Sequence, residues 1–310
     1  MGCGMSARED EPAEGALSFR DTAVLPSWND GPVRAAILDF VRSVTAPGET
    51  FVPPADRIVT FDNDGTLWCE KPLYIQADFV FRRFVEMVRE DPRRAGEQPY
   101  KAVVEGDRAW LMDVYAHVPE LIKGVTEAFG GITTEAFDAA ARDFFASAVH
   151  PTLGRPYTQV AYRPMRELID FLGASDFRVY ICSAGGRDFV RAVCEQVYGL
   201  PRDRVIGSAT TLEYRDGDLY RTAGVEQPID DGPGKPVHIW ARTGRKPLLA
   251  GGNADGDVAM LESARFALLL HHDDAEREFA YDDGAEKALA AAAARGWTVV
   301  SIKEDFVTVF

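Results

Sequence analysis

The stretch of residues 58–66 constrains the fold of this chain more than any other. Residues 58–61 are β-branched or aromatic and predict a short buried strand. Two carboxylates, Asp62 and Asp64, follow this strand directly, and a glycine and a threonine complete the turn. Because two close carboxylates repel each other and are costly to bury, their position at a strand end indicates a bound cation. One carboxylate can then act as a nucleophile and the other as a proton donor.

An Asp-Asn-Asp-Gly turn by itself is also typical of a solvated loop. A calcium-binding EF-hand loop is excluded because Gly65 occupies the fourth position counted from Asp62, not the sixth. Three pieces further along the chain favour a catalytic site instead. They are Ser183 after a second predicted strand, Lys235 in a Gly-Lys-Pro sequence, and residues 252–257 (Gly-Asn-Ala-Asp-Gly-Asp) after a third. Ligands of open α/β sheets bind beyond the carboxyl ends of the strands, where these pieces would meet.

The alternation of predicted strands and helices favours an α/β fold with a doubly wound, Rossmann-like parallel sheet. Directly after the Asp62 turn the pattern becomes mostly helical, and Pro and Gly residues separate the predicted helices at 75–88, 109–116, 119–129 and 134–148. Further on, the sequence predicts a helix at 188–198 and a small β-hairpin at 208–214 and 219–222 with an Asp-Gly turn. The expected division is a disordered tail (1–20), a core (21–67 and 163–310) and an inserted helical cap (68–162).

The composition excludes several classes of partner. A formal net charge of −15 over 310 residues argues against a nucleic-acid or anionic-membrane surface. No apolar run reaches the ~20 residues of a membrane span. The four cysteines form no CxxC pair, which favours buried thiols in a reducing compartment and hence a cytoplasmic protein. A secreted or periplasmic location stays open if a signal peptide was removed. The sequence gives no signal for the oligomeric state.

These four motifs, in this order, resemble those of the haloacid dehalogenase superfamily, and within it the phosphoserine-phosphatase-like hydrolases with a helical cap. The resemblance extends from about Leu25 to the C-terminus. It implies that Asp62 attacks phosphorus and forms an aspartyl-phosphate, while Asp64 acts as general acid and then as general base. It also implies that Lys235 lies between Asp62 and the phosphoryl group, keeps the nucleophile ionised and neutralises charge in the transition state.

The resemblance further implies a phosphate-binding loop and a Mg²⁺ site. Ser183, with the backbone N–H groups of Ala184 and Gly185, would hold a phosphoryl oxygen, and Thr66 would fix the catalytic turn. The implied protein ligands of Mg²⁺ are the Asp62 carboxylate, the backbone carbonyl of Asp64 and the loop that contains Asn253 and Asp257.

The fourth motif departs from the usual family pattern, because Asn253 stands where relatives commonly have an aspartate. An amide oxygen can still ligate Mg²⁺ but brings no charge, so the direct ligand is open among Asn253, Asp255 and Asp257. Asp255 is alternatively expected to cap the helix that starts near Asp257.

Other residues are weaker candidates for the substrate pocket. Glu70 and Arg187 are expected to face the substrate, and Lys71 and Arg155 are further pocket candidates. Residues 271–274 (His-His-Asp-Asp) look like metal ligands but are expected to be surface or structural.

The expected function is a Mg²⁺-dependent phosphatase that hydrolyses a small phosphorylated metabolite. A dehalogenase is disfavoured because its chemistry has no use for the second carboxylate, Asp64. A phosphotransferase would use the same residues. A binding protein that keeps the fold without turnover is the alternative from another class, and Asn253 would be its marker.

Overall fold

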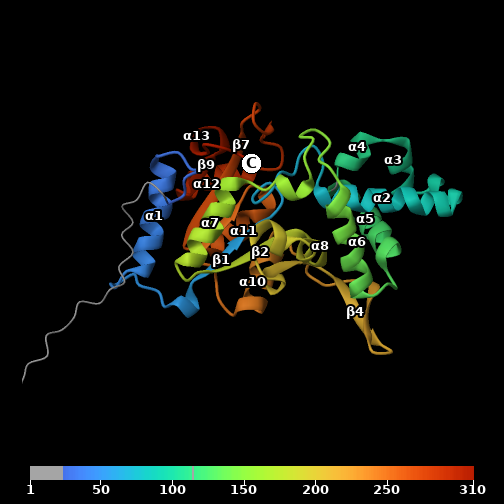
Figure 1. Cartoon of the computed structure of the whole chain (residues 1–310), viewed down its shortest axis with the longest axis horizontal. Helices are drawn as coiled ribbons and strands as arrows, with labels where there is room; N and C mark the ends of the chain where they lie inside the picture. Colours follow the sequence, from blue (N-terminus) through green and yellow to red (C-terminus); the bar gives the residue numbers. More distant parts are fainter. Residues whose placement is uncertain (1–23, 114) are drawn as a thin grey trace, which may run out of the picture.

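The computed structural model describes residues 24–113 and 115–310. The tail predicted at residues 1–20 lies outside this range. Within it, the main sheet has seven strands in the order β3-β2-β1-β6-β7-β8, and β9 pairs with β7. All ladders of this sheet are parallel except β7 with β8, which confirms the predicted fold class (Figure 1). The strands are β1 (Ile58–Phe61), β2 (Arg178–Gly186), β3 (Val205–Ser208), β6 (Leu249–Gly252), β7 (Phe266–Asp273), β8 (Ala280–Tyr281) and β9 (Thr298–Ser301).

The strand that precedes the catalytic turn, β1, lies inside the sheet. It pairs with β2 on one side and with β6 on the other. All four of its residues are buried, as the run of β-branched and aromatic side chains predicts. Because the three strands are parallel, their carboxyl ends deliver residues from three distant parts of the chain to one edge of the sheet.

Helices cover both faces of the sheet. Successive side chains of a strand point to opposite faces, and the apolar ones join a separate cluster on each face. Val59 and Phe61 belong to the cluster under α1 and α7, whereas Ile58 belongs to the cluster under α10, α11 and α12. The sheet is therefore doubly wound. The helices that flank it are α1 (Pro32–Thr45), α7 (Arg163–Ala174), α8 (Arg187–Arg191), α9 (Cys194–Tyr198), α10 (Gly234–Thr243), α11 (Val258–Ser263), α12 (Glu286–Arg295) and α13 (Ile302–Asp305).

The single helix predicted at 188–198 is wrong in one respect, because two short helices, α8 and α9, replace it. The backbone N–H groups of Ala192 and Val193 bond to carbonyls three residues back, which tightens the chain and ends the first helix. Short 3₁₀ segments occur elsewhere in the described chain, at η1 (Pro54–Asp56), η2 (Pro92–Gly96), η3 (Tyr115–His117), η4 (Tyr157–Gln159), η5 (Arg202–Arg204) and η6 (Asp255–Asp257).

Five α-helices of the described chain follow β1 and form a body to one side of the sheet, which we call the helical insert (Figure 1). They are α2 (Ile75–Glu90), α3 (Tyr100–Glu105), α4 (Arg108–Met112), α5 (Val118–Phe129) and α6 (Thr134–Ser147). The helix predicted at 109–116 is shorter than expected, because α4 ends at Met112. Aromatic rings hold the insert together: Phe79 stacks on Phe129 at 5.0 Å between centroids and lies 5.2 Å from Phe189 of α8.

The predicted hairpin is confirmed as β4 (Thr210–Arg215) and β5 (Asp218–Val225). Its turn residues Asp216 and Gly217 both have positive φ, as a tight hairpin turn requires. The hairpin also contacts the helical insert. The Gly131 N–H donates to the Arg221 carbonyl (2.7 Å), and the Arg221 N–H donates to the Ile132 carbonyl (2.9 Å). The insert is thus attached to the core at a point far from its own ends.

None of the helices in the described part of the chain combines the length and the apolar character that a membrane span requires.

Candidate active site

The turn after β1 is fixed by backbone contacts. The Asp62 N–H donates to the Gly251 carbonyl (2.9 Å) of β6, and the Asn63 carbonyl accepts from Leu67 N–H (2.8 Å). Gly65 has φ +74°, and a Cβ there would lie 2.1 Å from Nδ2 of Asn253. Only glycine therefore permits the turn to approach the loop after β6 this closely. The turn directs Asp62 and Asp64 toward one cavity.

Lys235 contacts residues in or next to the other three predicted motifs. Its side chain is 1% exposed, and Nζ lies 2.5 Å from Oδ1 of Asp62 and 2.9 Å from Oδ1 of Asp257. Nζ also donates to the Cys182 carbonyl (2.7 Å) in β2, next to Ser183. Three directed contacts hold the ammonium group in one place, so the lysine is an ordered part of the site and not a surface residue.

One ammonium group between two carboxylates cannot offset both. Burial raises the pKa of Asp62 well above its usual range, and Asp257 raises it further, against the effect of Lys235. Burial alone would lower the pKa of Lys235, but Asp257 and Asp62 raise it well above its usual value, so the amine stays charged. Burial also raises the pKa of Asp64 to about 6, although a hydrogen bond from Trp68 lowers it. A carboxyl group with such a pKa can both give and accept a proton near neutral pH.

The loop after β6 is tied to the catalytic turn. Oδ1 of Asn253 accepts a hydrogen bond from the Thr66 hydroxyl (3.0 Å), and both side chains are buried. Oδ2 of Asp257 accepts from the N–H groups of Asn253 (2.9 Å) and Ala254 (3.0 Å). Asp257 therefore braces its own loop with one oxygen and binds Lys235 with the other.

The expectation that Asp255 caps the helix starting near Asp257 is wrong. Its Oδ1 accepts from the N–H groups of Lys287 (2.8 Å) and Ala288 (3.0 Å) in the first turn of α12. Asp255 thus caps α12, a helix about thirty residues further along the chain. A local sequence pattern cannot distinguish a cap on the next helix from a cap on a distant one.

The last residues of β2, 183–186, approach the same cavity through their backbone. β2 continues to Gly186, three residues beyond the predicted end, with an irregular register between Ser183 and Gly186. Ser183 is buried, and its Oγ accepts from the Gly185 N–H (3.1 Å), whereas Ala184 and Gly185 line the cavity. The Gly186 N–H donates to Oε1 of Gln76 (2.6 Å) in the insert.

A cavity of about 360 Å³ opens from these residues toward the insert and the hairpin. Its polar end is lined by residues of the four predicted motifs, by the pocket candidate Glu70 and by Asp231, which was not predicted. The residues are Asp62, Asp64, Glu70, Ala184, Gly185, Gly186, Asp231, Lys235, Ala254, Gly256 and Asp257. Its other end is lined by α2, α5 and the hairpin. The volume is in the range of small-molecule sites.

The weaker candidates fall into two groups. Glu70 lines the cavity and accepts a hydrogen bond from the Tyr281 hydroxyl (2.7 Å). Arg187, by contrast, is not among the residues that line it, and its guanidinium group pairs with Asp188 (3.5 Å) and Glu226 (3.4 Å). The two further candidates each contact an aromatic ring, Lys71 on Tyr281 and Arg155 on Phe310.

The buried His272, which binds the turn after β1, was not predicted as part of the site. Nε2 of His272 lies 2.8 Å from the Gly65 carbonyl, and Nδ1 lies 3.0 Å from Oε2 of Glu278. Because a carbonyl only accepts, Nε2 carries the proton. Tyr162 donates to the other oxygen of Glu278. The expectation of a structural role fits His272, but its contact with the catalytic turn depends on the tertiary fold and has no signal in the local sequence.

The donor set suits Mg²⁺, a cation that prefers carboxylate, carbonyl and amide oxygens and retains several waters. Five acidic residues line the cavity against two basic ones, Lys235 and Arg221, so a divalent cation would offset an excess of negative charge. Among the described residues, no group of three or more His, Cys, Asp and Glu side chains could hold a metal by itself. The Asp64 carbonyl and the Asn253 amide would therefore be needed beside Asp62.

Comparison with known proteins places the chain in a family. No curated protein gives a significant match. Among solved structures, it is similar to a protein of unknown function from Bordetella pertussis Tohama I, with 20% identity, TM-score 0.51, and coverage of 79% of this chain and 98% of that one. A functionally unknown protein from Anaerococcus prevotii DSM 20548 gives 16% identity, TM-score 0.55, and coverage of 87% and 91%.

A phosphoserine phosphatase from T. onnurineus gives 20% identity and covers 72% of this chain and 88% of that one, but its TM-score of 0.35 carries no argument about activity. The family model described as haloacid dehalogenase-like hydrolase matches residues 59–262, which include all four motifs. Since this match covers more than half of the sequence, the chain belongs to the haloacid dehalogenase-like hydrolases.

Proposed function

We propose that this protein is a Mg²⁺-dependent phosphatase that hydrolyses a small phosphate monoester through an aspartyl-phosphate. The observation that carries this proposal is the position of the Lys235 ammonium, 2.5 Å from Asp62 and 2.9 Å from Asp257, at the polar end of a cavity that Asp64 also lines. A nucleophile, a fixed cation and a second carboxyl group are the parts that phosphoryl transfer requires.

In the first step an oxygen of Asp62 attacks phosphorus, and the bond from phosphorus to the leaving oxygen breaks. Asp64, protonated and oriented by the hydrogen bond from Trp68 (2.8 Å), gives its proton to that oxygen. In the second step Asp64 takes a proton from water, which attacks the phosphoryl group and restores Asp62. Lys235 stabilises the charge on the phosphoryl oxygens. The Gly185 and Gly186 N–H groups at the end of β2 donate to Ser183 and Gln76 in this structure.

Bound Mg²⁺ would supply positive charge to the transferring phosphoryl group. We assign its protein ligands to the Asp62 carboxylate, the Asp64 carbonyl and the Asn253 amide oxygen. That oxygen already accepts from Thr66 but has a second lone pair. Asp257 would act on the metal site by bracing the Asn253 backbone.

We also propose that residues 68–162 form a cap that encloses the substrate. Helices α2 and α5 of the insert line the same cavity as Asp62. A cavity of about 360 Å³ bounded in this way admits a small ester more readily than a folded protein. The described cysteines, Cys69, Cys182 and Cys194, are buried free thiols, which supports the proposed location in a reducing compartment such as the cytoplasm.

The test is hydrolysis of a chromogenic phosphate ester by the full chain with Mg²⁺, with EDTA, and in Asp62→Asn. We expect metal-dependent turnover that falls on the order of 10⁴-fold or more in the variant, because the nucleophile is lost. Asp39→Asn, the same change on the exposed face of α1, is the matched control and should keep full activity. Absence of turnover over a wide ester panel would overturn the phosphatase proposal and favour a binding role.

A further inference from the structure

The half of the cavity that faces away from Lys235 is almost entirely apolar. Its walls come from α2, α5 and the segments beside them, and α5 contributes four aliphatic side chains. The apolar side chains are Tyr74, Ala77, Val80, Phe81, Val118, Leu121, Ile122, Val125, Val225 and Ile229. Among the described residues of α2 and α5, none that lines the cavity is charged.

Most polar side chains in this half already have a partner within the protein; the exceptions are Oγ1 of Thr210 and Nε of Arg221, which are buried without one. Gln76 accepts from the Gly186 N–H, and the Thr126 hydroxyl donates to the Lys123 carbonyl of its own helix (2.9 Å). Arg221 donates to Asp188 (3.2 Å), and its guanidinium lies 3.9 Å from the centre of the Phe137 ring. A charged substituent of a substrate would therefore lose its water here and find the nearest cation occupied.

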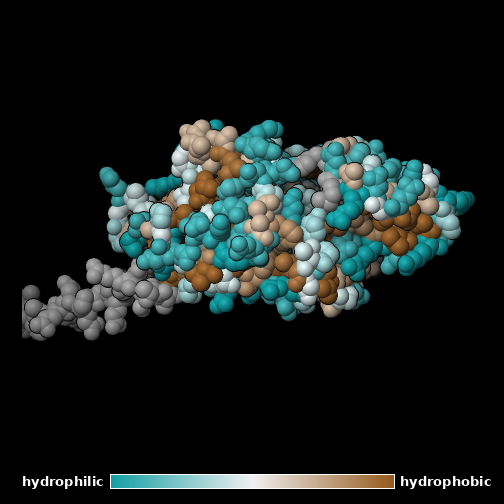
Figure 2. Space-filling model, turned by 90° about the horizontal axis from the view of Figure 1, so that it is seen from above, coloured by the Kyte–Doolittle hydropathy of each residue, from teal (hydrophilic) through white to brown (hydrophobic). Residues whose placement is uncertain are grey.

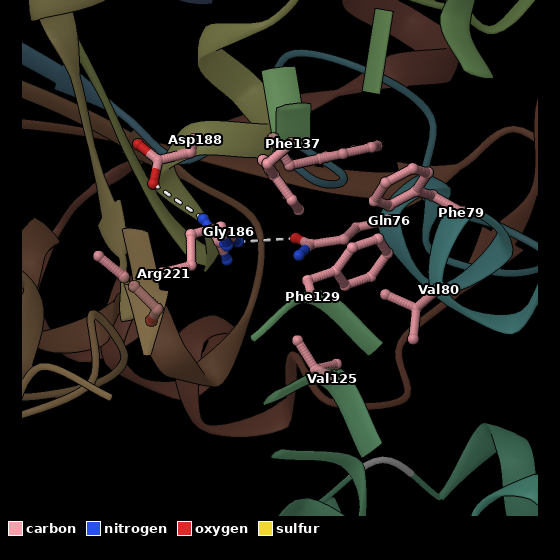
Figure 3. Close-up of a pocket in the computed structure, with 12 residues that line it drawn as sticks. Gln76, Phe79, Val80, Val125, Phe129, Phe137, Gly186, Asp188 and Arg221 are labelled. Atoms are coloured by element: carbon pink, nitrogen blue, oxygen red, sulfur yellow. Dashed lines mark hydrogen bonds and ion pairs between the residues drawn. The ribbon is translucent and has the colours of Figure 1, made fainter. Parts of the chain in front are cut away.

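Figure 3 shows a small hollow beside the apolar half of the main cavity. The Arg221–Asp188 pair lies on one side, and Val80, Val125 and Phe129 lie on the other. The hollow between them, about 20 Å³, shares Val80 and Val125 with the main cavity. It has room for about one water, so a substituent of the substrate could approach the Arg221–Asp188 pair only from the main cavity, which Arg221 also lines.

The charged residues of the two helices pair elsewhere. Arg82 pairs with Asp78 (2.9 Å), Arg83 with Glu90 (2.9 Å) and Lys123 with Glu127 (3.7 Å), and none of these residues lines the cavity. The visible surface of the insert is correspondingly hydrophilic, with separate apolar patches (Figure 2). The apolar face on the inside is thus not a general property of these helices.

We propose that the leaving group of the substrate is an uncharged, apolar alcohol or phenol, whose alkyl or aryl body lies between α2 and α5. This proposal rests on the proposed phosphatase function and narrows its substrate class. The size agrees, because an apolar cavity of about 150 Å³ in another protein holds benzene. The cavity of about 360 Å³ has room for a phosphoryl group and a body of six or more carbons. Amino acids, sugars and nucleosides are disfavoured, since their polar groups would lose hydrogen bonds to water.

The test compares three esters with the same type of ester bond and a similar leaving oxygen: hexyl phosphate, 6-aminohexyl phosphate, and the phosphate ester of 6-hydroxyhexanoic acid. With Mg²⁺ and the full chain, we expect kcat/KM for hexyl phosphate to exceed both others by about tenfold or more, mainly through KM. Equal values, or a preference for either charged ester, would overturn the apolar class and leave the phosphatase proposal intact. No turnover of any of the three would count against the phosphatase itself.

Variants at Leu121 test whether the leaving group of the substrate lies against α5. Leu121→Ala should lower kcat/KM for hexyl phosphate by about three- to tenfold, because buried methylene contacts are lost. Leu121→Glu should shift the preference toward 6-aminohexyl phosphate, whereas its neutral isostere Leu121→Gln should not. Glu120→Ala, an exposed neighbour on the same helix, should leave the hexyl preference unchanged. If Leu121→Glu and Leu121→Gln, both folded by circular dichroism, treat the three esters alike, the leaving group does not contact α5.

Discussion

The two ends of the cavity differ in their interactions: specific polar contacts at the sheet edge, and apolar surface between α2 and α5. At the sheet edge, each functional group has specific partners: Lys235 makes three directed contacts, and Asp257 uses both of its oxygens. Between α2 and α5, residues such as Leu121 and Val125 offer apolar surface without directional contacts. A single change at the sheet edge leaves a buried polar group without its partner, whereas a change in the insert alters only shape and area. Substitutions should therefore have abrupt effects at one end and graded effects at the other.

The strongest test of this contrast is Lys235→Met, which keeps the length of the side chain but removes the charge. Turnover should fall on the order of 10²- to 10³-fold, as for loss of a placed electrostatic group. Steady-state kinetics with Mg²⁺ measures the effect, and Lys246→Met, at an exposed position, serves as control. A rate within about threefold of the unmodified protein would show that Lys235 has no part in catalysis, and would contradict the expected difference between the two ends of the cavity.

A second test asks how far the directed contacts extend behind the turn. His272→Ala should lower the free energy of unfolding by about 1–3 kcal/mol, because it removes the partner of Glu278 Oε2 and of the Gly65 carbonyl, while Tyr162 still binds the other oxygen of Glu278. It should also lower kcat by about tenfold through displacement of the turn, with less effect on KM. Denaturant unfolding and kinetics would be measured together. His271→Ala is the matched control, since the neighbouring histidine is partly exposed; equal effects of the two changes would confine His272 to a general role in stability.

A third test sharpens the assignment of the metal ligands. Asn253→Asp adds a charge to the proposed ligand set, so the Mg²⁺ concentration at half-maximal activity should fall by about tenfold. Titration of activity with Mg²⁺ gives this value. Asn29→Asp adds the same charge at an exposed site and should have no effect. An unchanged Mg²⁺ requirement in Asn253→Asp would contradict direct ligation by residue 253.

The smallest effect is expected for Arg187→Ala. The guanidinium group pairs with Asp188 and Glu226 outside the cavity, so kcat/KM should change by less than about twofold. The same phosphatase assay measures it. A large rise in KM would show instead that Arg187 turns toward the substrate, and the polar end of the cavity would then include this loop.

The sequence predicted the parts of the site that depend on strand ends. Three neighbouring parallel strands supply these parts: Asp62 follows β1, residues 183–186 end β2, and Asn253 follows β6. Each strand is a compact apolar run that is visible in the sequence. Parallel pairing then brings these ends to one edge without further information. The helical insert was predictable for a similar reason, because its helices carry a 3.6-residue apolar period.

Contacts between distant segments were beyond prediction. Asp255 caps α12, His272 binds the catalytic turn, and the hairpin joins the insert through Arg221. Each contact depends on the orientation of a loop or on the packing of two elements, and nothing in the neighbouring residues encodes the partner. The position of Arg187 outside the cavity lining has the same origin, since its pairing with Glu226 depends on the segment after the hairpin.

The central place of β1 has a consequence for the order in which the molecule can assemble. Its first neighbour starts at Arg178 and its second at Leu249, so β1 has no sheet partner nearby in the sequence. Closing such long loops is entropically costly and slow. During synthesis from the N-terminus, Asp62 therefore emerges well before Lys235 and Asp257, the residues that bind or neighbour it in the folded chain.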